Sequence, residues 1–346
     1  MLDERKLKIL LAIINNYINS AEPVGSRTIS KKYDFGVSSA TIRNEMSDLE
    51  DLGFLNKPHS SAGRVPSDKA YRFYVDKLMK SGHMESDTLK DFEIREMLMK
   101  ESNEMEELIQ NSAKLLSAIT SYTSIVASPK MKSSRVKQIQ LMPLDDLGIL
   151  IIIVCDTGVV KNSIYKPEKH ISSEHLNIIS NFLNSKLKGL TIDELLIQLE
   201  KNVFEEMYEF KYIIDKLIPE INNSVKDLVS TELYFDGLTK ILNFPEYKDI
   251  EKVKSFISFV EDKNLILDIL SSSPATDDIN IIIGNENIYA PIKDISIITA
   301  TYTMEGKIIG KIGLMGPTRM DYLNLIDTLK LFSTNITELL NLLAYK

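Results

Sequence analysis

Apolar residues recur at helical spacing through the first eighty residues, and turn residues separate the helical stretches. The pattern predicts four helices, at residues 4–19, 26–33, 39–52 and 68–80. We expect Ser26 to cap the second helix and either Ser38 or Ser39 to cap the third. A strand at 54–57, a loop and a short returning strand at 64–65 are expected before the fourth helix. The pattern therefore predicts a helix-turn-helix followed by a β-hairpin.

The pattern changes twice beyond residue 81. A long helix is predicted over 86–122, and strands are predicted at 123–127, 136–142, 147–154 and 159–165. Helical spacing returns over 168–230, and the stretch that follows is mixed and mostly helical to 272. Further strands are expected at 279–284, 295–303 and 307–315, before a last helix at 319–343. A domain interrupted by an insertion explains this order better than a simple series of domains.

The third predicted helix has one apolar face and one polar face. Ile42, Met46 and Leu49 fall within about 60° of one another at 100° per residue, so they can pack against the preceding helices. An α-helix fits the major groove of B-DNA, where Arg pairs with guanine, Asn with adenine and Ser with either, while Ala contacts the thymine methyl. The polar face therefore supplies the candidate base-reading residues, which are Ala40, Arg43, Asn44 and Ser47.

Side chains that can reach DNA phosphates surround this helix. They lie at the start of the second helix, at the start of the third, and in and after the hairpin: Ser26, Arg27, Thr28, Ser39, Thr41, Lys57, His59, Ser60, Ser61, Arg64 and Lys69. Arg64 could also enter a minor groove. Gly63 is expected to give the loop a backbone conformation that other residues resist.

Charge is distributed unevenly along the 346 residues, whose net charge is −8. Residues 1–80 contain 13 Lys and Arg against 10 Asp and Glu, whereas the remainder contains 28 against 39. This asymmetry suits a small nucleic-acid-binding module on an acidic body.

The longest apolar run, 147–155, is too short to cross a bilayer, and the first residues include acids where a signal peptide needs bases. We therefore expect a cytoplasmic protein that has no membrane partner.

Other candidate sites favour structural roles. The single cysteine, Cys155, cannot form a disulfide framework and is expected to be buried and inert. His170 and His175 lack the pattern of a metal site, and the paired aspartates at 145–146 and 277–278 are typical of turns. Residues 313–322 lack the spacing of a phosphate loop, so Pro317 is expected to start a helix and Arg319 to pack or pair. We predict no metal, no cofactor and no enzymatic activity.

Several motifs, in order along nearly the whole chain, resemble those of one family. The N-terminal motifs are PVGSRT at 23–28, VSSATIRNEM at 37–46, PHSSAGRVP at 58–66 and DKAYR at 68–72. The C-terminal motifs are YFDGL at 234–238, IGNEN at 283–287, TATY at 299–302 and GLMGPTRMDY at 313–322. With these motifs the sequence resembles the heat-inducible transcription repressor HrcA family.

The resemblance implies an α+β protein in three parts. These are an N-terminal winged helix-turn-helix, a GAF-like α/β domain, and a mostly helical dimerising insertion that interrupts the GAF-like domain. The winged helix would occupy residues 1–80, and residues 81–122 would form a helical linker and the first helix of the GAF-like domain. That domain would comprise 123–167 and 231–346, with the insertion at 168–230.

The resemblance also implies a function. The family represses heat-shock chaperone operons by binding an inverted-repeat operator in double-stranded DNA, and heat shock relieves this repression. A homodimer is expected, because a palindromic site matches a two-fold symmetric protein. A GroE-type chaperonin is the expected partner that keeps the repressor in its active fold. The alternative is a ligand-sensing transcriptional regulator with a small-molecule pocket in the GAF-like domain.

Overall fold

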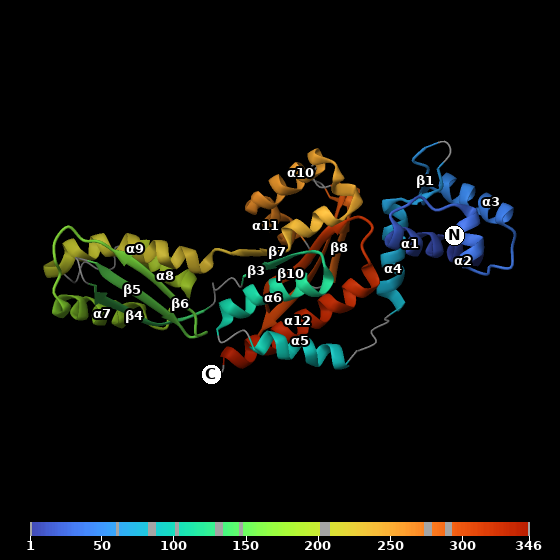
Figure 1. The fold of residues 1–346 in the computed structure, drawn as a ribbon. Coiled ribbons are helices and arrows are strands. Elements are labelled where there is room, and N and C mark those ends of the chain that lie inside the picture. Colours follow the sequence, from blue (N-terminus) through green and yellow to red (C-terminus); the bar gives the residue numbers. More distant parts are fainter. Residues whose placement is uncertain are drawn as a thin grey trace.

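The computed structural model describes residues 2–59, 62–81, 88–100, 104–128, 134–144, 148–200, 208–272, 279–287 and 293–344. Three bodies lie in a row (Figure 1): an N-terminal unit, a central five-stranded sheet flanked by helices, and a body with a three-stranded sheet and its own helices. Helices and antiparallel sheets are combined within the same chain, so the expected α+β class is confirmed.

The N-terminal unit combines helices with a short hairpin. Its elements are α1 (Glu4–Ser20), α2 (Ser26–Lys32), α3 (Ser39–Asp51), β1 (Leu55–Asn56), β2 (Val65–Pro66) and α4 (Asp68–Ser81). Ser38 caps α3, since its hydroxyl accepts a hydrogen bond from the Thr41 amide at 3.2 Å. The expectation that Ser26 caps α2 is wrong, because Gly25 occupies the N-cap and Ser26 is the first helical residue.

The central sheet has the strand order β7-β3-β10-β9-β8, and every neighbouring pair is antiparallel. The strands are β3 (Thr123–Ala127), β7 (Leu233–Asp236), β8 (Ile279–Ile283), β9 (Ile295–Met304) and β10 (Lys307–Pro317). One face packs on α5 (Thr88–Lys100), α6 (Met105–Thr120) and α12 (Tyr322–Ala344). The other packs on η3 (Leu238–Asn243), η4 (Pro245–Lys248), α10 (Ile250–Glu261) and α11 (Lys263–Ser272). Alternation along β9 divides its side chains between these two cores, as a strand's period of two requires.

Two helix boundaries differ from the prediction. The helix expected over 86–122 is two helices, α5 and α6, because Glu104 at the N-cap of α6 has an extended backbone. Both helices bury apolar residues in the same core. Pro317 does not start a helix: it pairs with Ile295 as the last residue of β10, and α12 begins at Tyr322.

A bulge distorts β10 between Ile308 and Gly310, where the register with β9 shifts. A Cβ atom at Gly310 would lie 2.1 Å from the Tyr302 hydroxyl oxygen and 2.6 Å from the Ala127 carbonyl oxygen. The buried Tyr302 hydroxyl donates a hydrogen bond to that carbonyl. Glycine is therefore required by close approach, and the backbone at the bulge is held in place by β3 and β9.

The third body has its own sheet and core. Strands β4 (Val136–Pro143), β5 (Ile149–Cys155) and β6 (Val160–Tyr165) are antiparallel in that order. One face of this sheet packs on α7 (Ser173–Leu187), α8 (Ile192–Glu200), η2 (Tyr208–Phe210) and α9 (Lys211–Val229). The expected grouping of 123–167 in one domain with 231–346 is wrong for the strands at 136–165. Apolar alternation predicts that a strand is half-buried, but it does not identify the sheet to which the strand belongs.

The third body joins the central sheet through a two-stranded neck. The chain leaves through β3 and returns through β7, which pair with each other so that Ala127 lies opposite Leu233. Beyond this pair, the Ser128 amide donates to the Glu232 carbonyl at 2.7 Å, and the Glu232 amide donates to the Ser128 hydroxyl at 2.7 Å. A segment inserted between two adjacent strands leaves the central sheet intact. The described part of the insertion is therefore 134–144, 148–200 and 208–229.

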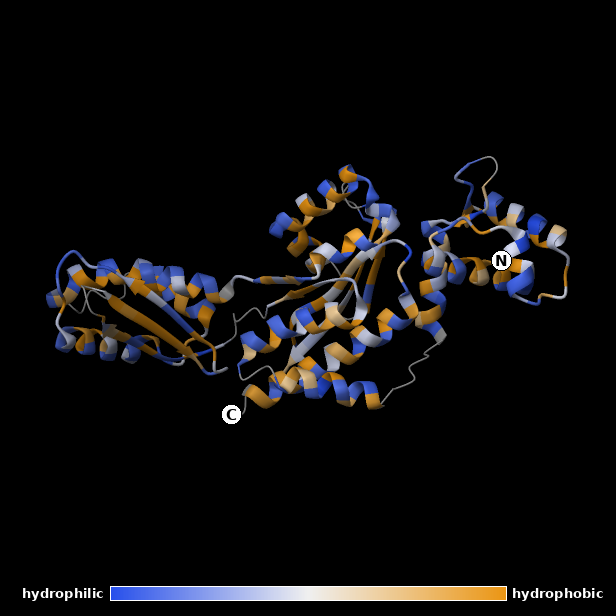
Figure 2. Ribbon diagram, viewed as in Figure 1, coloured by the Kyte–Doolittle hydropathy of each residue, from blue (hydrophilic) through white to orange (hydrophobic). Residues whose placement is uncertain are grey.

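Within the described ranges, no helix is both long and apolar enough to span a bilayer. The apolar residues instead follow the core-facing surfaces, and Figure 2 shows them concentrated along β5 and on the inner sides of the helices. Cys155 lies at the end of β5 and is fully buried, as expected. This burial raises the pKa of its thiol to about 11.

We predict that native Cys155 resists thiol reagents. At pH 8, a pKa raised by two units from 9.0 to about 11 lowers the thiolate fraction about 100-fold, and burial further blocks access. The rate of modification by Ellman's reagent should be at least about 100-fold slower in the native protein than in guanidinium chloride. Equal rates in the two conditions would contradict the buried position.

Candidate nucleic-acid interface

Helix α3 turns its polar face outward because its apolar face is packed inside the N-terminal unit. Ile42 and Leu49 are completely buried and Met46 nearly so, together with residues of α1 and α2. Burying each such side chain contributes about 1.5–3 kcal/mol, which fixes the rotation of the helix about its axis. The four candidate base-reading residues, Ala40, Arg43, Asn44 and Ser47, are all exposed on the opposite face.

Acidic side chains of α3 are paired with cations of α1. The Lys6 Nζ atom lies 2.8 Å from Glu45 Oε2 and 3.1 Å from Asp48 Oδ2, and Arg5 Nη1 lies 3.5 Å from Glu45 Oε1. The hydrogen bond to Glu45 raises the pKa of Lys6 above its ordinary value. Sequence reasoning did not identify Arg5 and Lys6, because nothing in the local pattern shows that α1 lies against this side of α3. These pairs neutralise negative charge beside the exposed face.

A groove of about 410 Å³ lies between the start of α2, the polar face of α3 and the hairpin. Its lining contains four cationic side chains and no acidic one: Val24, Gly25, Ser26, Arg27, Arg43, Met46, Lys57, Ala62, Gly63 and Arg64. The fold thus brings one candidate base-reading residue together with four of the candidate phosphate contacts, although they come from three separate elements. The result is a concave, positively charged surface of the kind that attracts a phosphate backbone.

Arg64 is held inside the N-terminal unit. Its Nη2 atom lies 2.6 Å from Glu50 Oε2 of α3, and its side chain is only 18% exposed. Its backbone exchanges two hydrogen bonds with Val24, at 2.8 and 2.9 Å. Glycine is needed at residue 63 because of close approach, since a Cβ at Gly63 would lie 2.5 Å from the Val24 carbonyl oxygen. Arg64 therefore ties the hairpin both to α3 and to the chain before α2.

The remaining candidates lie around this groove. Thr41 pairs with the Ser38 hydroxyl at 3.1 Å, so it belongs with Ser39 to the first turn of α3, while Thr28 and His59 are exposed. Ser60 and Ser61 lie outside the described residues. Lys69 is not among the residues that line the groove. It donates to the Leu52 carbonyl at 2.8 Å and lies over the Phe54 ring, where it stabilises the C-terminal end of α3.

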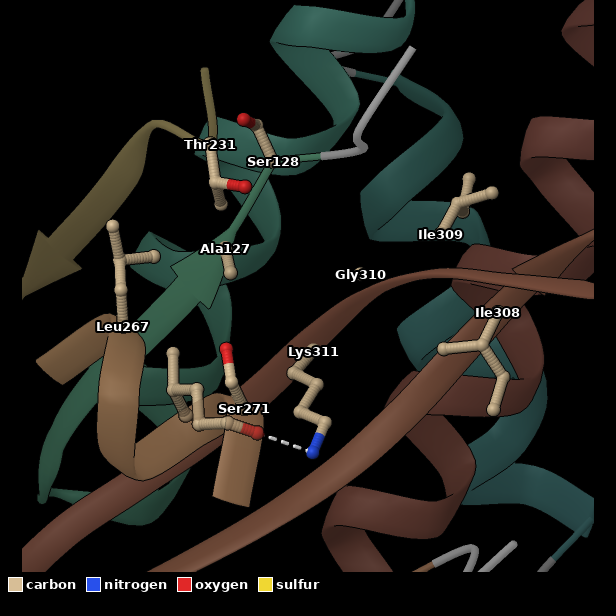
Figure 3. A pocket seen from close by; sticks show the side chains of 10 residues that line it. Ala127, Ser128, Thr231, Leu267, Ser271, Ile308, Ile309, Gly310 and Lys311 are labelled. Carbon is tan, nitrogen blue, oxygen red and sulfur yellow. Dashed lines mark hydrogen bonds between the residues drawn. The ribbon is translucent and has the colours of Figure 1, made fainter. Parts of the chain in front are cut away.

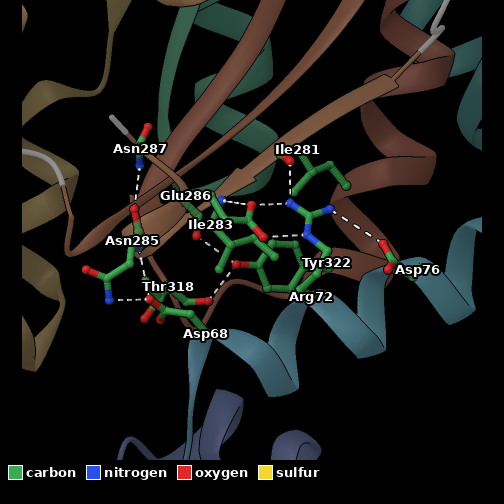
Figure 4. Close-up of polar contacts among 12 residues, drawn as sticks. Asp68, Arg72, Asp76, Ile281, Ile283, Asn285, Glu286, Asn287, Thr318 and Tyr322 are labelled. Atoms are coloured by element: carbon green, nitrogen blue, oxygen red, sulfur yellow. Dashed lines mark hydrogen bonds and ion pairs between the residues drawn. The ribbon is translucent and has the colours of Figure 1, made fainter. Parts of the chain in front are cut away.

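Helix α4 joins the N-terminal unit to the edge of the central sheet (Figure 4). Arg72 donates to the Ile281 carbonyl at 2.6 Å and binds the Glu286 carboxylate with two nitrogens. Asp68 accepts from the Asn285 amide at 2.9 Å and from its side chain at 2.8 Å. These contacts join the two motifs at 68–72 and 283–287, which lie more than 200 residues apart in the sequence.

A second contact between the same bodies centres on Arg319. Its Nη1 donates to the Ile18 carbonyl of α1 at 2.8 Å, its other nitrogens bind Glu246, and its guanidinium lies over the Phe244 ring. The expectation that Arg319 packs or pairs is confirmed. Together with the Arg72 and Asp68 contacts, this fixes the N-terminal unit on the central sheet at two places.

Known proteins match this chain over almost its whole length. The family model for the HrcA protein C terminal domain matches residues 106–326. A heat-inducible transcription repressor HrcA from Alkaliphilus metalliredigens is 44% identical over 98% of this chain and 98% of its own length. The relative of the same name from Thermoanaerobacter pseudethanolicus is 41% identical, covering 98% of this chain and 97% of its own.

A solved structure described only as that of a hypothetical protein matches 99% of this chain and 100% of its own, with a TM-score of 0.69 at 22% identity. That likeness supports the arrangement of the fold. The sequence matches place the chain in the class of transcription repressors. Within that class, it belongs to the family of the heat-inducible transcription repressor HrcA, which confirms the resemblance inferred from its motifs.

We predict that the ion pair between Glu50 and Arg64 limits local opening of the hairpin. A partly exposed pair contributes about 0.2–1 kcal/mol, so Glu50→Gln should accelerate hydrogen exchange of the Val24 and Arg64 amides by up to about fivefold. Asp51→Asn, which removes an exposed acid from the same helix, is the matched control and should leave both rates unchanged. Unchanged exchange in both variants would show that the pair does not hold the hairpin.

Proposed function

We propose that the chain is a sequence-specific transcriptional repressor of heat-shock chaperone operons. It binds an inverted-repeat operator as a homodimer, and heat shock relieves the repression. The observation that carries this proposal is the exposed polar face of α3 beside a groove with four cationic side chains, in a chain of the HrcA family. The names of the relatives, which are heat-inducible repressors, support the regulatory part.

In this proposal the N-terminal unit is a winged helix-turn-helix, with α3 as the recognition helix and the β1-β2 hairpin as the wing. Arg43 and Asn44 read base edges in the major groove, with Ala40 and Ser47 on the same face. Arg27 and Lys57 hold the phosphate backbone on either side, joined by the hydroxyls of Ser26, Thr28, Ser39 and Thr41. Arg64 positions the wing through Glu50, and this replaces its expected entry into the minor groove.

The proposed dimer forms through the insertion, with the second copy against the open face of the β4-β5-β6 sheet. That face carries the cross-strand row Met142, Leu150 and Ile164 and the pair Val154 and Val160, while Gln138, Gln140 and Asn162 also lie on it. Met142, Val160 and Ile164 are 42%, 54% and 59% exposed. An apolar sheet face of this kind is the usual mark of an interface. Two copies meeting face to face form a two-fold dimer, which matches a palindromic operator.

The heat response follows from marginal stability. A folded repressor has only a small free-energy margin, so modest heating can reduce the fraction that binds DNA. A GroE-type chaperonin, implied by family membership, would restore the active fold, and its supply would set the amount of active repressor. The central domain is GAF-like in this proposal and connects the DNA-binding unit to the dimer interface.

We predict that Arg43→Ala weakens binding to the operator by about 1–3 kcal/mol and relaxes base preference at one position in each half-site.

We predict that Lys57→Ala weakens binding to all DNA sequences equally. It should also reduce the slope of log K, the logarithm of the binding constant, against log salt by about 0.9. Lys31→Ala changes an exposed cation of α2 outside the groove and is the control. Fluorescence anisotropy with a palindromic fragment and its single-base variants measures each effect. A base preference unchanged in Arg43→Ala would rule out the base-reading role.

We also predict that Ile164→Glu separates the dimer, because it places a charge in the apolar row of Met142, Leu150 and Ile164. The dimer dissociation constant, measured by analytical ultracentrifugation, should rise at least about tenfold, which corresponds to 1.4 kcal/mol. Ile197→Glu places the same charge on α8, where the side chain is 51% exposed, and should leave the dimer intact. A dimer that survives Ile164→Glu, but not Ile197→Glu, would place the interface on the helical side instead.

A further inference from the structure

A pocket of about 220 Å³ opens where the β10 bulge, the end of β3 and the C-terminal part of α11 meet (Figure 3). Most of its wall is apolar, and its polar groups are few. It is lined by Ala127, Ser128, Thr231, Leu267, Leu270, Ser271, Ile308, Ile309, Gly310 and Lys311. Because Gly310 is wedged against Tyr302 and Ala127, the floor of the pocket is fixed backbone and does not depend on mobile side chains.

Lys311 places a positive charge in this apolar pocket. Its ammonium donates to the Leu270 carbonyl in the last turn of α11 (Figure 3). No acidic side chain among the described residues forms an ion pair with it. Partial burial lowers the pKa of Lys311, and no nearby acid opposes that shift. The lysine is thus a half-buried cation that donates to a carbonyl but has no anionic partner among the described residues, and such a position favours an anionic ligand.

Thr231 supplies a second unsatisfied group. Its buried hydroxyl oxygen has no hydrogen-bond partner, although a buried hydroxyl usually has one. Thr231 and Ser128 both belong to the neck that connects the central sheet to the insertion. Thr231 therefore lines the same cavity as Lys311, and Leu267 and Ile308 supply apolar walls.

We propose that this pocket binds a small monocarboxylate with an apolar body. The carboxylate pairs with Lys311, while the body packs on Leu267 and Ile308. One cation matches a single negative charge. The volume lies below the 300–1,000 Å³ of pockets for drug-sized ligands, so the ligand is small. The proposal is independent of DNA binding, and it gives the ligand-sensing alternative a definite site.

Calorimetric titration with benzoate and hexanoate tests the proposal, with the neutral amides benzamide and hexanamide as matched controls. At least one carboxylate should bind with a dissociation constant on the order of 0.1–1 mM, and its amide at least about tenfold more weakly. Lys311→Met should remove this preference for the acid. Lys307→Met, an exposed lysine of the same strand outside the pocket, should preserve it.

A second measurement locates the ligand. Bound carboxylate should slow hydrogen exchange of the Ser128 and Glu232 amides in the neck, because the occupant contacts both of its strands. Slower exchange in the wild type and in Lys307→Met, but not in Lys311→Met, supports the site. No saturable binding of either acid, equal affinity for acid and amide, or binding unaffected by Lys311→Met would overturn it. None of these results depends on whether the protein binds an operator.

Discussion

The docking of α4 on the edge of the central sheet is the constraint on which the rest of the structure depends. Helix α4 packs in the N-terminal core through Ala70 and Val75, and it also binds the sheet through Asp68 and Arg72. A Cβ at Gly284 would lie 2.6 Å from the Asp68 carboxylate, so the two bodies meet at backbone distance. The polar face of α3 therefore has a fixed direction relative to the central sheet.

The neck and this joint are built from different contacts. The joint combines ion pairs, hydrogen bonds to backbone carbonyls and the contact between Tyr71 and Tyr322 in a continuous apolar core. The neck consists of two strands, joined beyond Ala127 by the bonds between Ser128 and Glu232. The pocket beside Lys311 is lined by Ser128 and Thr231, so it lies where the central sheet and the insertion join.

Sequence reasoning succeeded where the determining contacts are local. The two faces of α3 follow from the spacing of Ile42, Met46 and Leu49 within one helix, and the Ser38 cap follows from its position before that helix. It failed where the partner of a residue or strand lies in a distant segment of the sequence. The strands at 136–165 alternate like core strands, but their partners are one another and α7 to α9. The ion pair between Arg64 and Glu50 was not predicted either, and the phosphate contact of Arg64 stays a prediction. Residue type and spacing identify neither the sheet to which a strand belongs nor the partner of a side chain.

An acidic chain can present a cationic groove because charges act over a short range in salt. At physiological ionic strength the Debye length is about 8 Å, so the acids of the distant bodies have little effect at α3. The acids that do matter belong to α3 itself, and each of three has a cation from elsewhere: Glu45 and Asp48 pair with α1, and Glu50 pairs with Arg64. Arg27, Arg43 and Lys57 are therefore the charges that the groove offers to a ligand. The net charge of −8 describes the chain as a whole and does not determine what this surface attracts.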